Sequence, residues 1–520
     1  MARIVIINPR FETSYWGMEY ALDLLGVKAS VPAACLPLLA ALTPKEHEVT
    51  IIDENVEPID FDRCAQADIV AMTGMVVQRF RMVELLKELK ARNCFTVVGG
   101  PWITAKENYF GSLVDVAFIG EAEQTWPLFL SQWAEGNYAS RYEQTEKTDM
   151  TNMPVPRFDM LKTKHYAYGS VQFTRGCPFN CEFCDIIVVF GRTPRIKTSA
   201  QVIAEVSALY EVGVTTAFVV DDNLIGNKNA IKVVLRDLVR WQEENDYPIA
   251  FVTEASIDLA DDEELMRLMV DANMKAVFVG IETPNEESLK TTKKFQNVRK
   301  GRSMIEKVHA IQRAGMEVTS GAIVGFDNDD SSIFEKQKEF LKDARIVTTM
   351  LGMLSAIPKT PLYDRLLKEG RLDNDDPPAF GTNVIPLKMD RAELRDGYVG
   401  LLRDLNEGEA YFDRADDLYL NSGMELEPTR RRHVAKSRLK IMALNASWLL
   451  AAIVIVARLI WFIPEKDLKK LYLRRFWGAV RKRSPAVTLH LYAIKCAMHY
   501  HAYRLVKEIE ADRPMIINSY

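Results

Sequence analysis

The chain has 520 residues, of which 48% are hydrophobic and 26% are charged, and its net charge is −5. This length exceeds what one hydrophobic core supports, so several domains are expected. The composition is that of a globular protein, and the slightly acidic balance gives no reason to expect a nucleic acid as partner.

The first residues and the scattered cysteines indicate the compartment. Met1–Ile7 is too short an apolar run for a secretory signal and predicts a first buried strand. Four isolated cysteines suit a reducing cytosol as small buried side chains: Cys35, Cys64, Cys94 and Cys496. We therefore expect a cytoplasmic protein.

Residues 1–145 alternate apolar strands with amphipathic helices, which predicts a doubly wound parallel sheet of the Rossmann-like α/β class. Helices are expected at Cys35–Leu42 and Phe80–Ala91, among others. The predicted strands are Ile4–Asn8, Val49–Asp53, Ile69–Thr73, Thr96–Gly99 and Val114–Ile119. Such sheets bind ligands beyond the carboxyl ends of their strands.

Small residues follow several of these strands, where they would let the backbone approach a bulky ligand closely. The candidate ligand-binding residues are Thr73, Gly74, Gly99, Gly100, Thr104, Gly120 and Glu121. No G-x-G-x-x-G follows the first strand, so a dinucleotide is disfavoured. The alternative is that these glycines only form tight turns.

Three of the seven cysteines, Cys177, Cys181 and Cys184, lie in a C-x3-C-x2-C loop after the apolar run Val171–Phe173. A disulfide is disfavoured because the number is odd, and structural zinc sites close with four ligands. Three thiolates suit a soft iron–sulfur centre, and three ligands on a four-iron cube would leave one iron open. Three buried cysteines without a metal is the weaker alternative.

The alternation of strand and helix returns after a proline-containing linker, residues 146–170, and continues over residues 171–365. The predicted strands are Val171–Phe173, Thr216–Val220, Ala250–Thr253, Ala276–Ile281, Glu317–Val324 and Met350–Ile357. Six βα units predict a partial (β/α)6 TIM-like barrel, in which chemistry gathers at the carboxyl ends of the strands.

The cysteine loop, with Phe183 before its last cysteine, resembles the signature of the radical S-adenosylmethionine (SAM) superfamily. The first block, through its GG turn followed by Thr104 and its GEAE turn, resembles the cobalamin-binding domain that precedes many radical SAM domains, which implies that the candidate residues of this block bind cobalamin. The resemblance implies a 4Fe–4S cluster whose open iron binds SAM and cleaves it to a 5′-deoxyadenosyl radical. The only histidine of the first block is His47, so we expect a cobalamin without a histidine lower ligand.

The resemblance also implies where SAM binds, because several barrel loops match the family's SAM-contact positions. These positions are Asp221, Asp222, Thr253, Glu254, Glu282, Gly325 and Pro358. Acidic side chains suit the ammonium and sulfonium groups of SAM. Alternatives stay open: the aspartates could form a solvated turn that caps a helix, and Gly325 could serve packing alone.

Residues 366–435 predict a helical C-terminal domain, and residues 436–520 form a basic, apolar helical tail. Within the tail, Ile441–Ile463 is about long enough to span a bilayer but contains Arg458, and basic residues flank it on both sides. A helix lying on an anionic membrane surface explains this charge better than a span does. A buried core helix is the alternative.

The resemblance as a whole is strongest to the hopanoid C-2 methylases. It runs through TGMVVQRFRM, VVGGPW, GEAEQTW, RGCPFNCEFCDII, VDDNLIGNK, GIETPNEESL, GFDNDD and IPKTPLYDRL. It implies a cobalamin-dependent radical SAM C-methyltransferase that methylates an unactivated carbon of an apolar lipid, with flavodoxin or ferredoxin as reductant. We expect a peripheral position on the inner face of the membrane.

Two alternative functions remain open. One keeps the cofactors but performs carbon–carbon coupling or cyclisation on a lipid or tetrapyrrole. The other is an iron–sulfur redox or binding protein that does not cleave SAM.

Overall fold

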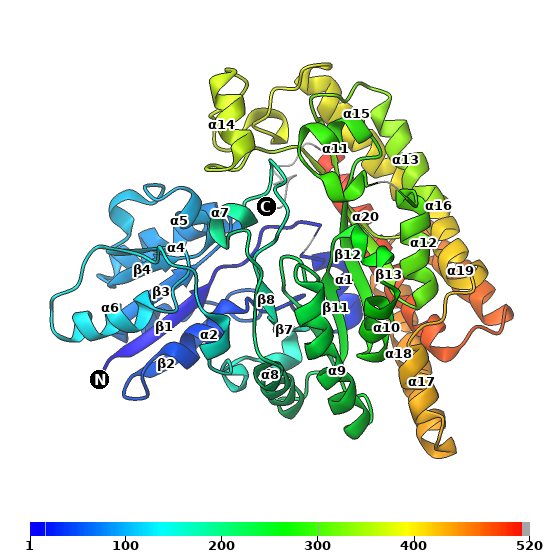
Figure 1. Cartoon of the computed structure of the whole chain (residues 1–520), viewed down its shortest axis with the longest axis horizontal. Coiled ribbons are helices and arrows are strands. Elements are labelled where there is room, and N and C mark those ends of the chain that lie inside the picture. Colours follow the sequence, from blue (N-terminus) through cyan, green and yellow to red (C-terminus); the bar gives the residue numbers. More distant parts are fainter. Residues whose placement is uncertain (16, 300, 512–520) are drawn as a thin grey trace.

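The structure, a computed structural model, describes residues 1–15, 17–299 and 301–511. Figure 1 shows a first α/β domain on the left, a curved sheet with outer helices in the middle, and a group of helices on the right. Both sheets consist of six parallel strands, as the alternating pattern predicts.

The first sheet has the strand order β2-β1-β3-β4-β5-β6. Its strands are β1 (Arg3–Asn8), β2 (Glu48–Asp53), β3 (Ile69–Thr73), β4 (Thr96–Gly99), β5 (Val116–Ile119) and β6 (Arg141–Glu143). The first five confirm the predicted strands to within two residues. Strand β6 has no counterpart in the prediction, because three residues with two exposed charged ends carry no apolar signal.

Helices cover both faces of the first sheet. They are α2 (Cys35–Leu42), α3 (Phe61–Gln66), α4 (Arg79–Ala91), α5 (Pro101–Ala105) and α6 (Thr125–Ala134), whereas α1 (Glu19–Leu25) packs on the C-terminal helices described below. Apolar side chains of β1 alternate between two cores: Val5 and Ile7 pack toward α4, and Ile4 and Ile6 pack toward α2 and α6. A sheet buried on both faces leaves its carboxyl ends as the open edge.

The second sheet has its strands in chain order, β7-β10-β11-β12-β13-β14, which is the predicted open six-stranded barrel. The strands are β7 (Gly169–Val171), β10 (Thr216–Val219), β11 (Ala250–Glu254), β12 (Met274–Glu282), β13 (Glu317–Val324) and β14 (Thr349–Met353). The outer helices are α8 (Ser199–Glu211), α9 (Lys228–Glu244), α10 (Glu263–Asp271), α12 (Met304–Ala314) and α13 (Ile333–Asp343).

The first barrel strand ends earlier than the predicted range Val171–Phe173. The backbone N–H groups of Phe173 and Thr174 donate to the Asp221 carboxylate at 2.7 and 2.9 Å. These amides therefore bond to a side chain instead of a neighbouring strand, and the chain leaves the sheet two residues before the predicted end.

The C-terminal region is helical, as predicted, and the segments before and after residue 435 share one core. Its helices are α14 (Pro361–Lys368), α15 (Arg391–Leu405), α16 (Gly408–Asp416), α17 (Pro428–Val434), α18 (Arg438–Phe462), α19 (Lys466–Arg481) and α20 (Ala486–Glu510). Phe412 of α16, Leu459 of α18 and Tyr492 of α20 are buried in that core with residues of α1. The C-terminal helices thus bind the first domain as well as the barrel.

Candidate active site

The three cysteines lie in a loop closed at its base by a short antiparallel hairpin. Strand β8 (Thr174–Arg175) pairs with β9 (Arg195–Ile196), and the loop between them includes the short helix α7 (Ile186–Val189). Gly176 begins the loop with a φ of +91°, and a Cβ there would lie 3.0 Å from the carbonyl oxygens of Gly191 and Thr193, where the loop returns toward β9. Only glycine fits that turn without strain, so the sequence RGC fixes how the loop leaves the hairpin.

Hydrogen-bond donors approach each of the three thiols. Asn223 Nδ2 lies 3.8 Å from Cys177 Sγ, and Gln296 Nε2 lies 3.6 Å from Cys181 Sγ. The backbone N–H of Ile186 donates to Cys184. Burial raises the pKa of the Cys177 and Cys184 thiols above the ordinary value.

These residues fit an iron–sulfur cluster. Coordination to iron deprotonates a thiol, and N–H groups around the sulfurs stabilise the negative charge of a cluster. No group of His, Cys, Asp and Glu among the described residues has the arrangement that would hold a single metal ion. A four-iron cube differs from such an ion because each thiolate binds a different iron, so the ligands stand apart.

Asp221 and Asp222 hold the cysteine hairpin against the barrel. Asp221 accepts from the two backbone amides before the hairpin, and Asp222 accepts from Gly176 N at 2.8 Å. Burial raises the pKa of Asp221 to about 7 and that of Asp222 to about 6. The open alternative of a solvated turn is therefore wrong, since both carboxylates are buried or nearly buried and bonded to the cluster loop.

Glu254 at the end of β11 faces a cavity instead. No hydrogen bond or ion pair of its carboxylate is found within the described residues, and burial, reinforced by the charges of Asp222 and Asp221, raises its pKa to about 8. The carboxylates of Asp221, Asp222 and Glu254 lie together at the carboxyl-end edge of the barrel sheet, and such a group of carboxylates favours binding of a cation. The ammonium and sulfonium groups of SAM fit that charge.

Glu282 and Lys294 form a buried ion pair at the end of β12. Glu282 has a φ of +63°, which is uncommon for a residue with a side chain. A Cβ on Gly280 would lie within 2.5 Å of the charged ends of both partners, so glycine leaves room for the pair in this position. The Lys294 ammonium lies 5.8 Å from the centre of the Phe183 ring in the cysteine loop, which brings a positive charge to the thiols.

The remaining predicted SAM residues divide by role. Thr253 is buried and its hydroxyl donates to the Val219 carbonyl oxygen at 3.3 Å, so it joins two strands. Gly325 has a φ of +95°, and a Cβ there would lie 2.8 Å from Leu394, which supports the packing alternative. Pro358 lines the cavity beside Glu254.

The predicted residues of the first domain form its carboxyl-end loops. Gly100 has a φ of +102°, and a Cβ there would lie 2.6 Å from Thr73 Oγ1. Thr104 Oγ1 donates to the Gly100 carbonyl oxygen at 2.9 Å and accepts from Gly120 N at 3.0 Å, which joins the loops after β4 and β5. These loops are therefore fixed by their own contacts.

The other three predicted residues of the first domain, Gly74, Gly99 and Glu121, differ in their surroundings. Gly74 packs on Met82 and Gly99 packs on Phe118. Glu121 turns away from the edge and pairs with Arg175 of the hairpin. Sequence reasoning missed Arg175, because its partner lies 54 positions away.

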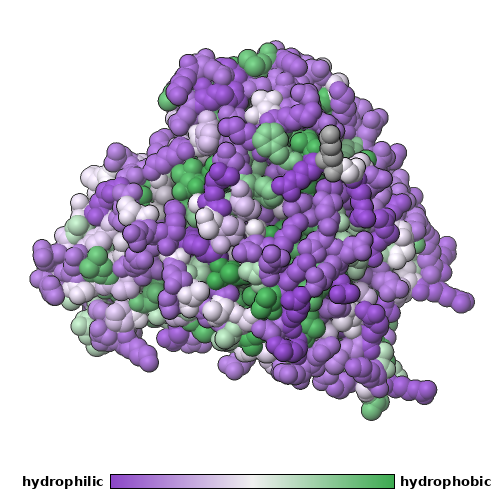
Figure 2. Space-filling view, in the orientation of Figure 1, coloured by the Kyte–Doolittle hydropathy of each residue, from purple (hydrophilic) through white to green (hydrophobic). Residues whose placement is uncertain are grey.

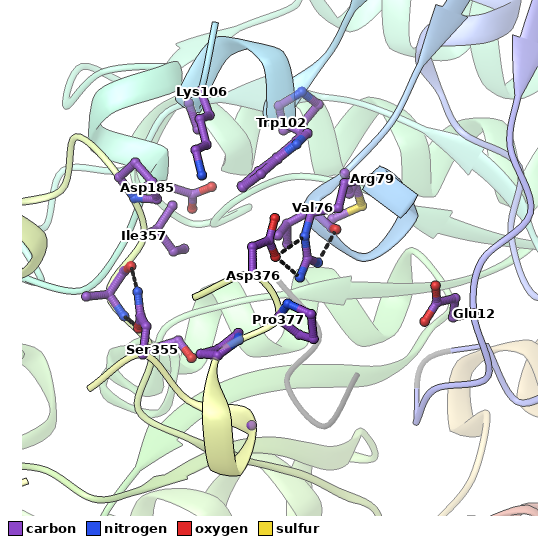
Figure 3. Close-up of a pocket in the computed structure, with 18 of the residues that line it drawn as sticks. Glu12, Val76, Arg79, Trp102, Lys106, Asp185, Ser355, Ile357, Asp376 and Pro377 are labelled. Carbon is purple, nitrogen blue, oxygen red and sulfur yellow. Dashed lines mark hydrogen bonds and ion pairs between the residues drawn. The ribbon is translucent and has the colours of Figure 1, made fainter. Parts of the chain in front are cut away.

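A cavity of about 1720 Å³ lies between the two carboxyl-end edges. Its walls come from the first domain (Met75, Val76, Trp102), the cysteine loop (Asp185, Ile186), the barrel (Glu254, Phe278, Pro358) and residues 373–381. Figure 3 shows side chains of these elements pointing into the same space, and Figure 2 shows apolar patches near the middle of a mostly hydrophilic face. The cysteines and the glycines of the first domain are not among its described lining residues, but the residues that follow Cys184, Gly74 and Gly100 are, namely Asp185, Met75 and Pro101.

The first-domain wall of this cavity combines apolar side chains such as Val76 and Trp102 with the charged side chains of Arg79 and Lys106. The buried indole N–H of Trp102 has no hydrogen-bond partner among the described residues. His47 lies before β2, at the opposite end of the sheet, where its Nδ1 accepts from Ala2 N at 3.1 Å. A corrin ring that packs on the glycine loops, with amide side chains to meet Trp102, suits this surface, and His47 cannot reach it.

One loop of the C-terminal region closes the cavity from the outside. Arg79 Nε and Nη2, at the start of α4, donate to Asp376 Oδ1 at 2.8 and 2.6 Å (Figure 3). Lys359 Nζ, after β14, donates to the Thr104 carbonyl oxygen at 2.6 Å. Sequence reasoning missed both contacts, since each joins segments more than 250 positions apart.

The parallel barrel and its three-thiol loop define the class of radical SAM enzymes. Residues 171–341 match the family model described as the radical SAM superfamily, and residues 360–513 match a model described as a domain of unknown function, DUF4070. The chain is 34% identical to the hopanoid C-2 methylase of Rhodopseudomonas palustris, over 72% of each chain. It is 39% identical to an uncharacterized methyltransferase of Synechocystis sp., over 96% of this chain and 91% of the relative.

A solved structure supports the fold over the whole length. The cobalamin-dependent SAM radical enzyme OxsB, with aqua-cobalamin and SAM bound, superposes with a TM-score of 0.54 and 14% identity. The superposition covers 98% of this chain and 80% of that one. The chain belongs to the radical SAM methyltransferases, in the family that contains the hopanoid C-2 methylase.

Membership settles the kind of reaction. The chain is an enzyme of the methylating radical SAM class, which uses a 4Fe–4S cluster and SAM and needs an external reductant. The alternative of an iron–sulfur redox or binding protein is set aside.

Proposed function

We propose that this enzyme methylates an unactivated carbon of an apolar lipid, with C-2 of a hopanoid ring as the leading candidate. The observation that carries the proposal is the cavity between the two sheet edges. Its volume of about 1720 Å³ exceeds the roughly 300–1,000 Å³ of an ordinary small-molecule site. A cavity of this size can hold the reacting ends of two cofactors and a multi-ring substrate together. The 34% identity to a hopanoid C-2 methylase supports that choice of lipid.

The side chains suggest how the site is divided. Cys177, Cys181 and Cys184 would hold the cluster, and the carboxylates of Asp222, Glu254 and Glu282 would surround SAM on the cluster side. When bound, these cofactors supply a carbon-centred radical and a methyl group. Phe278, Ile357 and Pro358 present apolar surface to the substrate and help exclude water from the cavity.

On the opposite wall, the loops around Gly74, Gly100 and Gly120 would receive cobalamin, with Thr73, Gly99 and Thr104 supporting them. A donor protein of the flavodoxin or ferredoxin type would supply the electrons.

Helix α18 supports a position on the membrane surface. It is the one helix of the described chain long and apolar enough to span a bilayer, yet only 17% of its most apolar window is buried. Arg458 argues against a lipid contact on its own side of the helix. Its Nη1 lies 3.4 Å from the Leu24 carbonyl oxygen at the end of α1, so this charge faces the protein.

The face of α18 that points away from its buried residues Trp448, Ala452, Ile455 and Leu459 is exposed and apolar at helical spacing. It consists of Leu439, Met442, Leu449, Leu450, Ile453, Val454, Ile460 and Trp461. Exposed basic residues continue on the adjoining α19: Lys466, Lys470, Arg474 and Arg481. An apolar face beside positive charge suits the interface of an anionic bilayer. We infer that the enzyme lies peripherally on the inner membrane face, from which a lipid substrate can enter.

Lipid profiling of cells with and without the gene tests the substrate. We expect a hopanoid with one added ring methyl only in cells that carry the gene, and unchanged hopanoids would remove this substrate from consideration. Reduced enzyme incubated with methyl-labelled SAM tests the reaction itself. Labelled product supports methyl transfer, whereas 5′-deoxyadenosine without label in the product would support coupling or cyclisation instead.

A further inference from the structure

Two arginines at the base of the cysteine hairpin bind two glutamates of the first domain. Arg175 Nη1 lies 2.8 Å from Glu121 Oε1 and 2.6 Å from Glu123 Oε1. Arg195 Nη1 lies 3.0 Å from Glu121 Oε1. We call these four side chains the arginine–glutamate clamp. Figure 1 shows β8 between the first domain and the barrel, where the clamp joins them.

The clamp is buried and its charges balance. The side chains of Glu121, Arg175 and Glu123 are 1%, 8% and 9% exposed, and that of Arg195 is 15% exposed. Burial opposes the charge of Glu123, but Arg175 outweighs this and holds the pKa of Glu123 below its ordinary value. Two positive and two negative groups thus compensate one another, and removal of one leaves a buried charge without its partner.

The linker completes the clamp. Thr148 N donates to Glu121 Oε2, and Thr148 Oγ1 donates to Glu123 Oε2, both at 2.9 Å. Arg195 Nη1 also donates to the Thr148 carbonyl oxygen at 2.6 Å. Three segments, namely the turn after β5, the linker and the hairpin, therefore meet in one hydrogen-bonded network.

The place of the clamp connects the two cofactor edges. Glu121 follows Gly120, whose amide is held by the loop after β4 on the first-domain edge. Arg175 precedes Cys177 by two residues and is the cross-strand partner of Arg195. A shift of the guanidinium groups relative to the glutamates would move the thiol loop relative to the first domain.

Resting on the function proposed above, we propose that the arginine–glutamate clamp fixes the separation between the cluster and cobalamin, and thereby couples radical formation to methyl transfer. Glu121, Glu123, Arg175 and Arg195 are positioning residues in this proposal, since they act through the hairpin and do not touch the substrate. A misplacement of about 1 Å can lower a rate by roughly 10²-fold when the reacting groups must meet in one geometry.

The test is Glu121→Gln, which keeps the shape of the side chain and removes its charge. The first readout is the spin–spin interaction between cob(II)alamin and the reduced cluster, which needs no substrate. We expect a changed or broadened distribution of the cluster–cobalt distance. The second readout is methylated product per 5′-deoxyadenosine, which we expect to fall by up to roughly 10²-fold because SAM cleavage depends on the cluster side alone.

A matched control is Glu57→Gln, which removes an ion pair between the same domain and the linker, Glu57–Lys162, that is not part of the clamp. It should leave both readouts at their wild-type values. If Glu121→Gln does not fold, Thr148→Val removes the hydrogen bond to Glu123, together with the one that Thr148 Oγ1 accepts from Gln144, and should change both readouts in the same direction by less.

An unchanged distance distribution, with product and 5′-deoxyadenosine falling in proportion, would overturn the proposal. So would Thr148→Val with both readouts at wild-type values. Failure of the proposed function is a separate result, because a wild-type enzyme that makes no methylated lipid still reports the cluster–cobalt distance.

Discussion

The two sheet edges that face the cavity have the same architecture and opposite chemistry. Each is the carboxyl end of six parallel strands. The edge of the first domain presents Met75, Val76 and the indole N–H of Trp102, which has no hydrogen-bond partner within the part of the chain that the structure describes. The barrel edge presents Glu254 and the thiol loop, with Lys294 beside it. Equivalent backbone positions thus serve different ligands, because strand order determines where a site forms and strand-end side chains determine what binds.

The contrast also separates two ways of holding a ligand. The first-domain loops depend on close packing that a single methyl group would block, as at Gly100. The barrel edge depends on charge, because its carboxylates are crowded and their pKa values are raised by burial. Substitutions should therefore impair ligand binding in different ways: through steric contact at the first-domain edge and through loss of charge at the barrel edge.

The largest effect on activity is expected when Cys177, Cys181 and Cys184, at the barrel edge, are together replaced by alanine. Removing every thiolate should abolish the iron–sulfur absorbance of anoxic protein and both SAM cleavage and methylation. Cobalamin binding at the other edge should persist, which absorbance of the corrin measures. Cys94→Ala, a buried thiol of the first domain, serves as the control and should leave the iron content unchanged. Retained iron in the triple variant would contradict the assignment.

The second-largest effect on activity is expected from the substitution Gly100→Ala at the first-domain edge. The added Cβ would lie 2.6 Å from Thr73 Oγ1 at a φ of +102°, so the loop must move, at a cost of about 1–3 kcal/mol. We expect cobalamin retention and methylation to be lost while SAM cleavage at the barrel continues.

The matched control is Gly136→Ala, which has a φ of +71° and no atom within 4 Å of the added methyl group. It should cost stability through strain but retain cobalamin. Normal cobalamin binding by Gly100→Ala would show that this edge is not the cobalamin surface.

A smaller effect concerns pH. The pKa of Glu254 is about 8 in the folded protein and its ordinary value is 4.5, so the folded state binds more protons between these values. The free energy of unfolding of cofactor-free protein should therefore fall as the pH rises from about 5 to 8. Glu254→Gln should flatten that dependence and be more stable than wild type at pH 8, as urea titrations at several pH values would measure. An equal slope in both proteins would contradict a cavity-facing, unpaired carboxylate.

The smallest effect on stability is expected from Ile453→Glu on the exposed face of α18. The side chain is 53% exposed, so the free energy of unfolding should change by no more than about 0.5 kcal/mol. Binding to anionic vesicles, measured by co-sedimentation, should nevertheless weaken strongly. Val233→Glu, at an equally exposed apolar position of α9, should leave vesicle binding unchanged. Equal binding of both variants would contradict the membrane proposal.

The local sequence pattern was sufficient to predict the thiol loop and the strands of both sheets except β6. Strand periodicity predicts both parallel sheets, since burial on two faces selects continuous apolar runs, and the C-x3-C-x2-C spacing predicts the metal chemistry without any long-range information. Even the carboxyl-end position of Glu254 follows from where β11 ends.

Only the tertiary structure decided which side chains meet. Glu121 is a candidate cofactor residue by position, yet its carboxylate binds Arg175 at a separation of 54 residues. Arg458 reads as a charge in an apolar helix, yet it caps the end of α1 at a separation of 434 residues. Short-range periodicity carries no signal for such pairs, because a buried charge can be compensated by any opposite charge that the fold brings within reach. The cavity has the same origin, since its walls come from every part of the chain.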